Sequence, residues 1–90
     1  MKSRSVQACE QIMRRLVKAG YTQQVSDTTL EKVIMVVRGG DPRTVKNWTN
    51  TLRALEYISP VGVRLFKLNV VKVQGLLELA VEIKGQKKLV

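Results

Sequence analysis

Five polar residues between positions 43 and 53 recur at helical spacing and fall on one side of a helix: Arg43, Lys46, Asn47, Asn50 and Arg53. Arginine donates two parallel hydrogen bonds to guanine, and asparagine pairs in the same way with adenine. We therefore expect Arg43 to contact guanine and Asn47 or Asn50 to contact adenine. Lys46, Arg53 and Thr44 are better placed for phosphate groups, as are the free backbone amides at the start of this helix.

Asp41 and Pro42 mark the start of the helix that would position these residues. Asp is a preferred N-cap residue, and Pro is favoured at the first helical position. The opposite side of the helix carries an apolar stripe about 80° wide that would face a core, formed by Val45, Trp48, Leu52 and Leu55. A solvated helix surface is the alternative interpretation of the polar side, but Glu would then be commoner than Asn.

The net charge of the whole chain also favours binding to a polyanion. Its 90 residues form one domain at most and include 16 Lys and Arg against 7 Asp and Glu, a net charge of +9. A small domain this basic usually binds a polyanion, such as nucleic acid, an anionic membrane surface or an acidic protein. Residues 38–67 hold six basic residues and only two acidic ones, Asp41 and Glu56. The excess charge is therefore concentrated around the helix that starts at Asp41 and Pro42.

Other chemistries lack the residues that they need. The chain has no histidine and a single cysteine, Cys9, so it offers no internal disulfide, no evident metal ligand set and no nucleophile with a neighbouring base. We expect no enzyme activity and no cofactor. No apolar run reaches the roughly 18 residues of a membrane span, and residues 1–5 do not resemble a signal peptide. We expect a cytoplasmic protein without a membrane partner.

Two further helices precede the polar one. Apolar residues recur at helical spacing over residues 3–19, and Gly20 is placed to end that helix. Residues 22–25 are interpreted as a connector. Ser26, Asp27 or Thr28 would cap the second helix, with Thr28 and Glu31 at capping-box spacing. Gly39 and Gly40 would end it.

After Glu56 the pattern changes to short strands. Residues 57–58 and 64–68 are strand-like, and the turn-forming residues 59–62 between them predict a short hairpin. Arg64 and Lys67 lie on this hairpin, and one of them would enter the minor groove beside the major groove that the helix reads.

Residues 70–84 fit two patterns. Strict alternation of apolar and polar residues would indicate a strand, but the length without a turn signal other than Gly75 favours a helix, which Asn69 could cap. The apolar arc of that helix, about 200°, is wider than packing on its own domain requires. We expect the surplus to contact a second copy of the chain, through Val73, Leu76, Leu77, Ala80 and Ile83.

Three helices followed by a hairpin predict a mainly α fold with a small β-hairpin: a winged helix-turn-helix over residues 1–68 and a C-terminal dimerisation helix with a basic tail over residues 69–90. Residues 30–68, with the segments GDPRTV at 40–45 and LRALEYI at 52–58, resemble small archaeal winged-helix DNA-binding proteins. Glu56 stands where that pattern often has glycine. The C-terminal helix is similar to that of PadR-type regulators, and the size and basicity are similar to those of archaeal centromere-binding proteins of plasmid partition.

The resemblance and the residues together predict a homodimer that binds palindromic double-stranded DNA. The helix that starts at Asp41 and Pro42 would lie in the major groove, and the hairpin would lie beside it. The resemblance implies transcription regulation or plasmid partition (DNA segregation), a nucleoid- or plasmid-associated location and a second protein in the complex. The alternative is a winged-helix adaptor whose basic surface binds an acidic protein.

Overall fold

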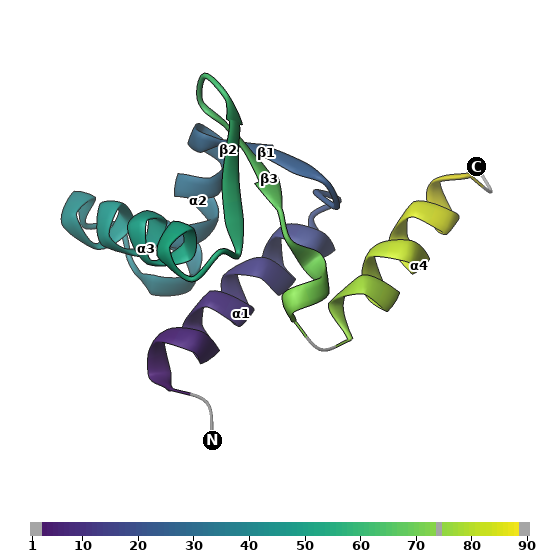
Figure 1. The fold of residues 1–90 in the computed structure, drawn as a ribbon, viewed down its shortest axis with the longest axis horizontal. Helices are drawn as coiled ribbons and strands as arrows, with labels where there is room; N and C mark the ends of the chain where they lie inside the picture. The colour runs from purple at the N-terminus through teal and green to yellow at the C-terminus, as the bar shows by residue number, and fades with distance from the viewer. Residues whose placement is uncertain (1–2, 74, 89–90) are drawn as a thin grey trace.

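The computed structural model describes residues 3–73 and 75–88, with side chains described to residue 82. This part of the chain is mainly helical with a three-stranded antiparallel sheet, a layout consistent with a winged-helix-like arrangement (Figure 1). The helices are α1 (Arg4–Lys18), α2 (Asp27–Arg38), α3 (Pro42–Ala54) and α4 (Leu76–Lys88), and a short 3-10 helix, η1 (Val70–Lys72), precedes α4. The strands are β1 (Gln24–Ser26), β2 (Ile58–Gly62) and β3 (Leu65–Leu68).

The first helix forms as its sequence predicts. The Ser3 hydroxyl caps α1 by accepting a hydrogen bond from the N–H of Val6 at 3.2 Å. Gly20 follows the helix at φ 101°, a conformation that glycine adopts without a steric penalty. The apolar side of α1 is buried in the middle of the core, where the helix packs against α2, α3 and α4.

Capping residues mark both ends of α2 and the start of α3. Ser26, one of the three candidates, caps α2 and accepts from the N–H of Thr29 at 3.2 Å. The predicted capping box is wrong, because its first residue, Thr28, already lies within α2. Gly39 ends α2 at φ 116°, and the Asp41 carboxylate accepts from the N–H of Arg43 at 2.8 Å to cap α3.

The sheet contains a strand that the sequence did not predict. β1 occupies part of the predicted connector and pairs with β3, so that Val25 lies opposite Phe66. The strand order is β1-β3-β2, which places β3 in the middle. Val25 is buried, whereas its neighbours on β1 are not. A three-residue segment with one buried residue is too short for its sequence pattern to distinguish a strand from a connector.

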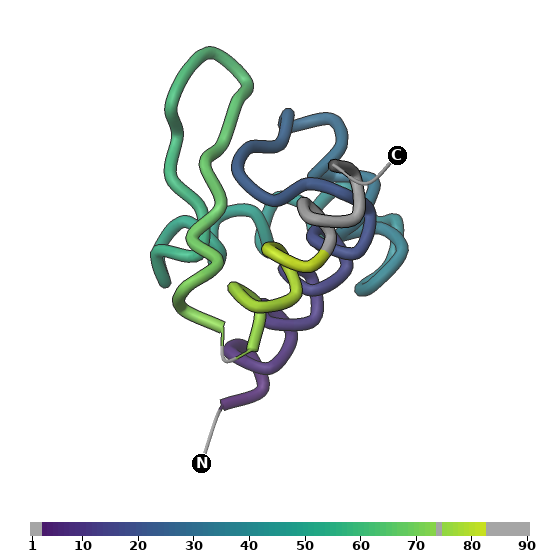
Figure 2. The backbone as a smooth tube through the Cα atoms, turned by 90° about the vertical axis from the view of Figure 1, so that its right-hand side faces the viewer, coloured from purple at the N-terminus to yellow at the C-terminus, as the bar shows by residue number. Residues whose placement is uncertain are grey.

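The predicted hairpin is present, but its turn lies later in the chain than predicted. Residues 59–62 belong to β2, and the turn is formed by Val63 and Arg64. Pro60 is tolerated because β2 is an edge strand, where a missing N–H breaks no essential pairing, and the register shifts between Pro60 and Gly62. Figure 2 shows the hairpin projecting from the helical body.

The C-terminal segment is helical, but the helix starts later than predicted. Gly75, at φ 80°, separates η1 from α4, which begins at Leu76. Asn69 makes no capping hydrogen bond with its side chain and instead donates from Nδ2 to the carbonyl of Glu56 at 3.2 Å. No helix in the described part of the chain combines the length and the apolar character needed to cross a membrane.

Candidate nucleic-acid interface

The structure brings the five polar residues together on the solvent side of α3. Arg43, Lys46, Asn47, Asn50 and Arg53 are all exposed, and we call these five residues the α3 polar surface. Thr44 is half-buried at its edge. The α3 sequence contains no acidic residue, so its cations have no carboxylate partner within the helix.

Packing of the opposite side fixes this orientation. Val45 and Leu52 are buried, and Trp48 and Leu55 are half-buried against the same core. All four residues of the predicted apolar stripe therefore face inward, as their spacing predicted. A helix anchored along one stripe holds its other side toward solvent.

The two asparagines keep their hydrogen-bonding groups available. Among the described residues, the side chains of Asn47 and Asn50 have no hydrogen-bond partner. The nearby threonines differ, because Thr49 donates to the carbonyl of Val45 at 2.9 Å and Thr51 to that of Asn47 at 2.8 Å. An exposed amide offers both a donor and an acceptor, the pair that the edge of an adenine requires.

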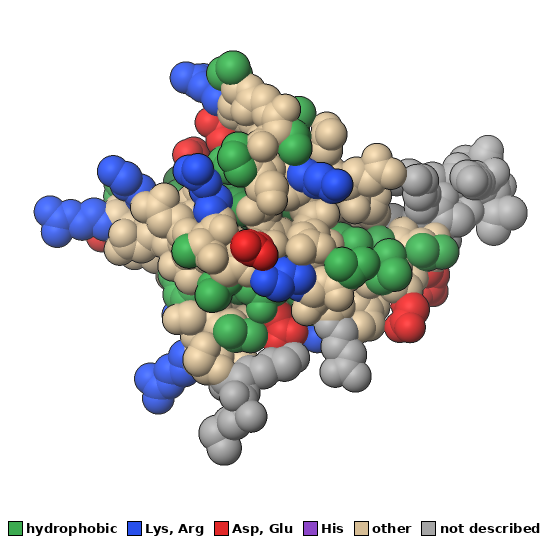
Figure 3. Space-filling view, viewed as in Figure 1, with side chains coloured by type: hydrophobic (Ala, Val, Ile, Leu, Met, Phe, Trp, Pro, Cys, Tyr) green, Lys and Arg blue, Asp and Glu red, His purple; other side chains and the backbone are tan. Residues whose placement is uncertain are grey.

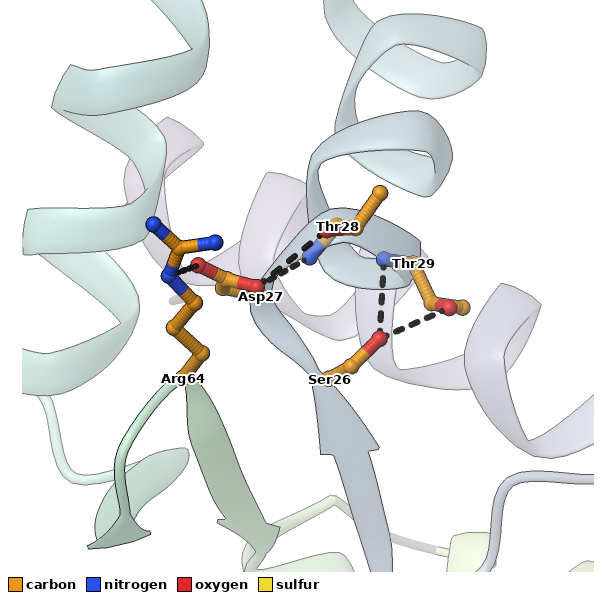
Figure 4. Close-up of polar contacts among 5 residues, drawn as sticks. All are labelled: Ser26, Asp27, Thr28, Thr29 and Arg64. Carbon is orange, nitrogen blue, oxygen red and sulfur yellow. Dashed lines mark hydrogen bonds and ion pairs between the residues drawn. The ribbon is translucent and has the colours of Figure 1, made fainter.

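Lys and Arg side chains lie around α3 and at the tip of the hairpin (Figure 3), and Arg64 is in the turn at that tip. It lies in the β2–β3 turn at φ 59°, and its side chain is 80% exposed. Its backbone carbonyl accepts a hydrogen bond from the N–H of Asp27 at 2.9 Å, and its Nε lies 3.9 Å from the Asp27 carboxylate. Figure 4 shows the ion pair, and the two contacts together fix the tip of the hairpin to the start of α2.

Lys67 lies apart from α3. Its neighbours on β3 pack toward the core, with Phe66 half-buried and Leu68 buried, so alternation directs Lys67 to the other side of the sheet. There it lines a groove of about 610 Å³ between the sheet, η1 and α4. The described residues around this groove include none from α3. The structure therefore does not bring Lys67 together with the α3 polar surface.

The residues predicted to form a dimer contact divide into two groups. Val73, Leu76 and Ala80 are buried in the core of the single chain, so they are not free to contact a second copy. Their burial corrects the prediction for these three: the apolar arc is wide because part of it packs against the chain's own core. Leu77 is exposed, and the side chain of Ile83 lies outside the described residues.

Two residues that the prediction did not name as dimer contacts complete an exposed apolar patch with Leu77. They are Val71 on η1 and Val81 on α4, which are 68% and 63% exposed. Leu77 and Val81 are one helical turn apart, and all three residues line the groove beside Lys67. The sequence pattern could have indicated Val81, because this residue falls within the apolar arc predicted for the C-terminal helix.

Arg38 is a basic residue beside α3 to which the sequence interpretation gave no contact role. It ends α2, and its guanidinium carbon lies 4.9 Å from the centroid of the Trp48 ring. Trp48 therefore packs against the core and also makes a cation–π contact with Arg38 at the surface. The position of Arg38 in the last turn of α2, next to the turn that leads into α3, was the sequence signal that could have predicted a contact role for it.

The remaining chemically reactive group is inaccessible. Cys9 is fully buried in α1, and burial raises the pKa of its thiol from 9.0 to about 11, with a smaller contribution from the negative charge of Glu10. Across the described residues, no three His, Cys, Asp or Glu side chains converge to hold a metal ion. No protein-family model matches this chain, and neither a curated protein nor a solved structure is a match for it.

Proposed function

We propose that this chain is a sequence-specific double-stranded DNA-binding protein that places α3 in the major groove. The observation that carries the proposal is the α3 polar surface, where three cations and two unpartnered amides lie on one side of a helix anchored along the other. An α-helix fits the width of the major groove, and these side chains match both phosphates and base edges.

Position along α3 assigns the roles. Arg43 is in the first turn, the part of a recognition helix that usually reaches the bases, and Asn47 and Asn50 follow one and two turns later. Lys46 and Arg53 flank them and contact phosphates. At the hairpin we assign the contact with the DNA minor groove to Arg64. Lys67 instead lines the protein groove beside α4.

A second copy of the chain would make the site palindromic. Leu77 and Val81 present apolar surface on α4, and a two-fold contact there would pair two α3 helices across one DNA duplex. This arrangement would suit a transcription regulator or a plasmid partition protein of the winged-helix class, which is the biological role that we propose.

Two α3 variants test the proposal, because they remove different kinds of contact. Arg43→Ala should relax the preference for one base pair and weaken binding to the preferred site by about 1–3 kcal/mol. Lys46→Ala should weaken binding to every duplex by a similar factor and leave the preference unchanged. The two are matched, since both truncate an exposed cation of the same helix.

The duplex for this test comes from selection out of a randomised pool, followed by anisotropy titration of the enriched and scrambled sequences. An enriched inverted repeat supports the proposal. Failure to enrich any duplex, together with tight binding to an acidic polypeptide such as polyglutamate, would contradict it and favour the adaptor function instead.

A further inference from the structure

A second basic site lies beyond the α3 polar surface, where three helices meet. A hollow of about 280 Å³ there is lined by Arg4 and Gln11 of α1, Arg38 of α2 and Trp48 of α3. The two arginines are far apart in the sequence, and only the fold brings them to one hollow. Trp48 joins this hollow to the helix that carries the α3 polar surface.

The charges of the hollow are not balanced by acids. Within the part of the chain that the structure describes, neither Arg4 nor Arg38 has an ion-pair partner, and no acidic side chain lines the hollow. The first turn of α1 contains no acidic residue either, so the positive end of the helix dipole adds to the two guanidinium charges. An anion would therefore be attracted by three sources of positive potential at once.

Trp48 gives the hollow a defined shape. The guanidinium of Arg38 lies over its ring, 4.9 Å from the centroid, which restricts the arginine without neutralising it. A guanidinium over a ring still presents N–H groups that can donate hydrogen bonds. Such a group suits the bidentate recognition of a phosphate.

We propose that Arg4 and Arg38, with Trp48 behind Arg38, bind a phosphate of the DNA backbone outside the major groove that α3 occupies. The inference rests on the proposed function and extends the DNA contact across α1 and α2. Because this site recognises only the backbone, it contributes affinity without sequence preference.

The test uses the full chain and the double variant Arg4→Gln/Arg38→Gln. Loss of one phosphate contact should reduce the slope of log K against log salt by about 0.9 and lower affinity for specific and scrambled duplexes alike, by roughly tenfold at low salt. Arg14→Gln/Arg15→Gln is the matched control, because both are exposed arginines of α1 that do not line the hollow. Arg38→Lys should retain part of the affinity, since it keeps the charge but loses the planar donor group.

Trp48 supplies a direct signal, because it is the only tryptophan of the chain. Duplex DNA should change its fluorescence in the wild-type protein and in Lys46→Ala, but not in Arg38→Gln. Inorganic phosphate, compared with chloride at equal ionic strength, should produce the change only at millimolar concentrations.

Three results would overturn the inference. An equal loss of affinity in Arg14→Gln/Arg15→Gln would show an effect of net charge, and the proposed function would stand. A fluorescence change with phosphate but none with saturating duplex would assign the hollow to a small anion. Failure of the wild-type protein to bind any duplex would overturn the proposed function and this inference with it.

Discussion

The N–H of Asp27 donates a hydrogen bond to the carbonyl of Arg64 over 2.9 Å, and the Asp27 carboxylate lies 3.9 Å from the Nε of the same arginine. The pair joins the first residue of α2 to the turn of the β2–β3 hairpin. The carboxylate also accepts from the N–H of Thr28 at 2.7 Å. Asp27 therefore positions the hairpin through its backbone and, with its side chain, would compete with DNA phosphate for Arg64.

Asp27→Asn separates these two effects. The amide keeps an acceptor for Thr28 and leaves the backbone hydrogen bond intact, but it removes the negative charge. We expect duplex affinity to rise about two- to fivefold, whereas stability should change by less than about 1 kcal/mol because the ion pair is exposed. Anisotropy and urea titrations measure the two quantities. In an Arg64→Ala background the same substitution should leave affinity unchanged, and an equal rise there would refute the competition.

Glu56 directly follows Leu55, the C-cap residue of α3, and adopts a backbone conformation that favours glycine. Its φ is 64°, a left-handed value that costs a residue with a side chain about 1–2 kcal/mol. Glu56→Gly should therefore raise the free energy of unfolding by roughly 0.5–1 kcal/mol, after the greater entropy of the unfolded glycine chain is subtracted. Glu56→Ala is the control for loss of the side chain, and urea denaturation should show no gain for it.

Local signals made the helices predictable. Asp41 and Pro42 occupy the positions at the start of α3 that their chemistry favours, and the apolar spacing of α1 and α3 predicted their buried sides correctly. The α3 polar surface followed from these two facts, because a helix with a known buried side has a known exposed side. The base-contact and phosphate roles of its residues stay predictions.

Features that depend on residues far apart in the chain were not predictable in this way. β1 exists through its pairing with β3, and Arg4 meets Arg38 only when α1 packs against α2 and α3. The turn of the hairpin was misplaced because Pro60 and Gly62 are typical turn residues, yet an edge strand with a shifted register accommodates both. The sequence pattern cannot show which residues of a wide apolar arc pack within the same chain and which stay exposed. Three residues that pack within the chain were therefore predicted to contact a second copy: Val73, Leu76 and Ala80.

The exposed apolar patch on α4 predicts an effect on oligomeric state. Leu77→Glu places a charge on this patch, and it should convert a dimer to a monomer in light scattering, because a buried unpaired carboxylate opposes association. Val63→Glu is the matched control, since Val63 is 95% exposed at the hairpin tip, away from α4. An unchanged mass for Leu77→Glu, with its helical circular dichroism retained, would exclude this patch as the dimer contact.

The buried thiol of Cys9 predicts how stability depends on alkaline pH. Its pKa rises from 9.0 to about 11 on folding, so below pH 9 the thiol is protonated in both states and contributes no pH dependence. Between pH 9 and 11 the unfolded chain releases the proton first, which lowers the free energy of unfolding by about 2 kcal/mol at pH 11. Urea titrations of the wild type and of Cys9→Ala over this pH range isolate the contribution of the thiol. Parallel pH profiles for the two proteins would contradict the assignment.

The salt dependence of duplex binding tests the DNA-binding claim most directly. Several phosphate contacts per chain are expected from Lys46 and Arg53 of α3, from Arg64 and from the Arg4–Arg38 hollow. Each adds about 0.9 to the slope of log K against log salt. A titration of a labelled duplex between about 50 and 200 mM salt should therefore give a straight line that falls steeply, with affinity lost by roughly a hundredfold or more. A flat response, or no binding at the lowest salt, would contradict the account.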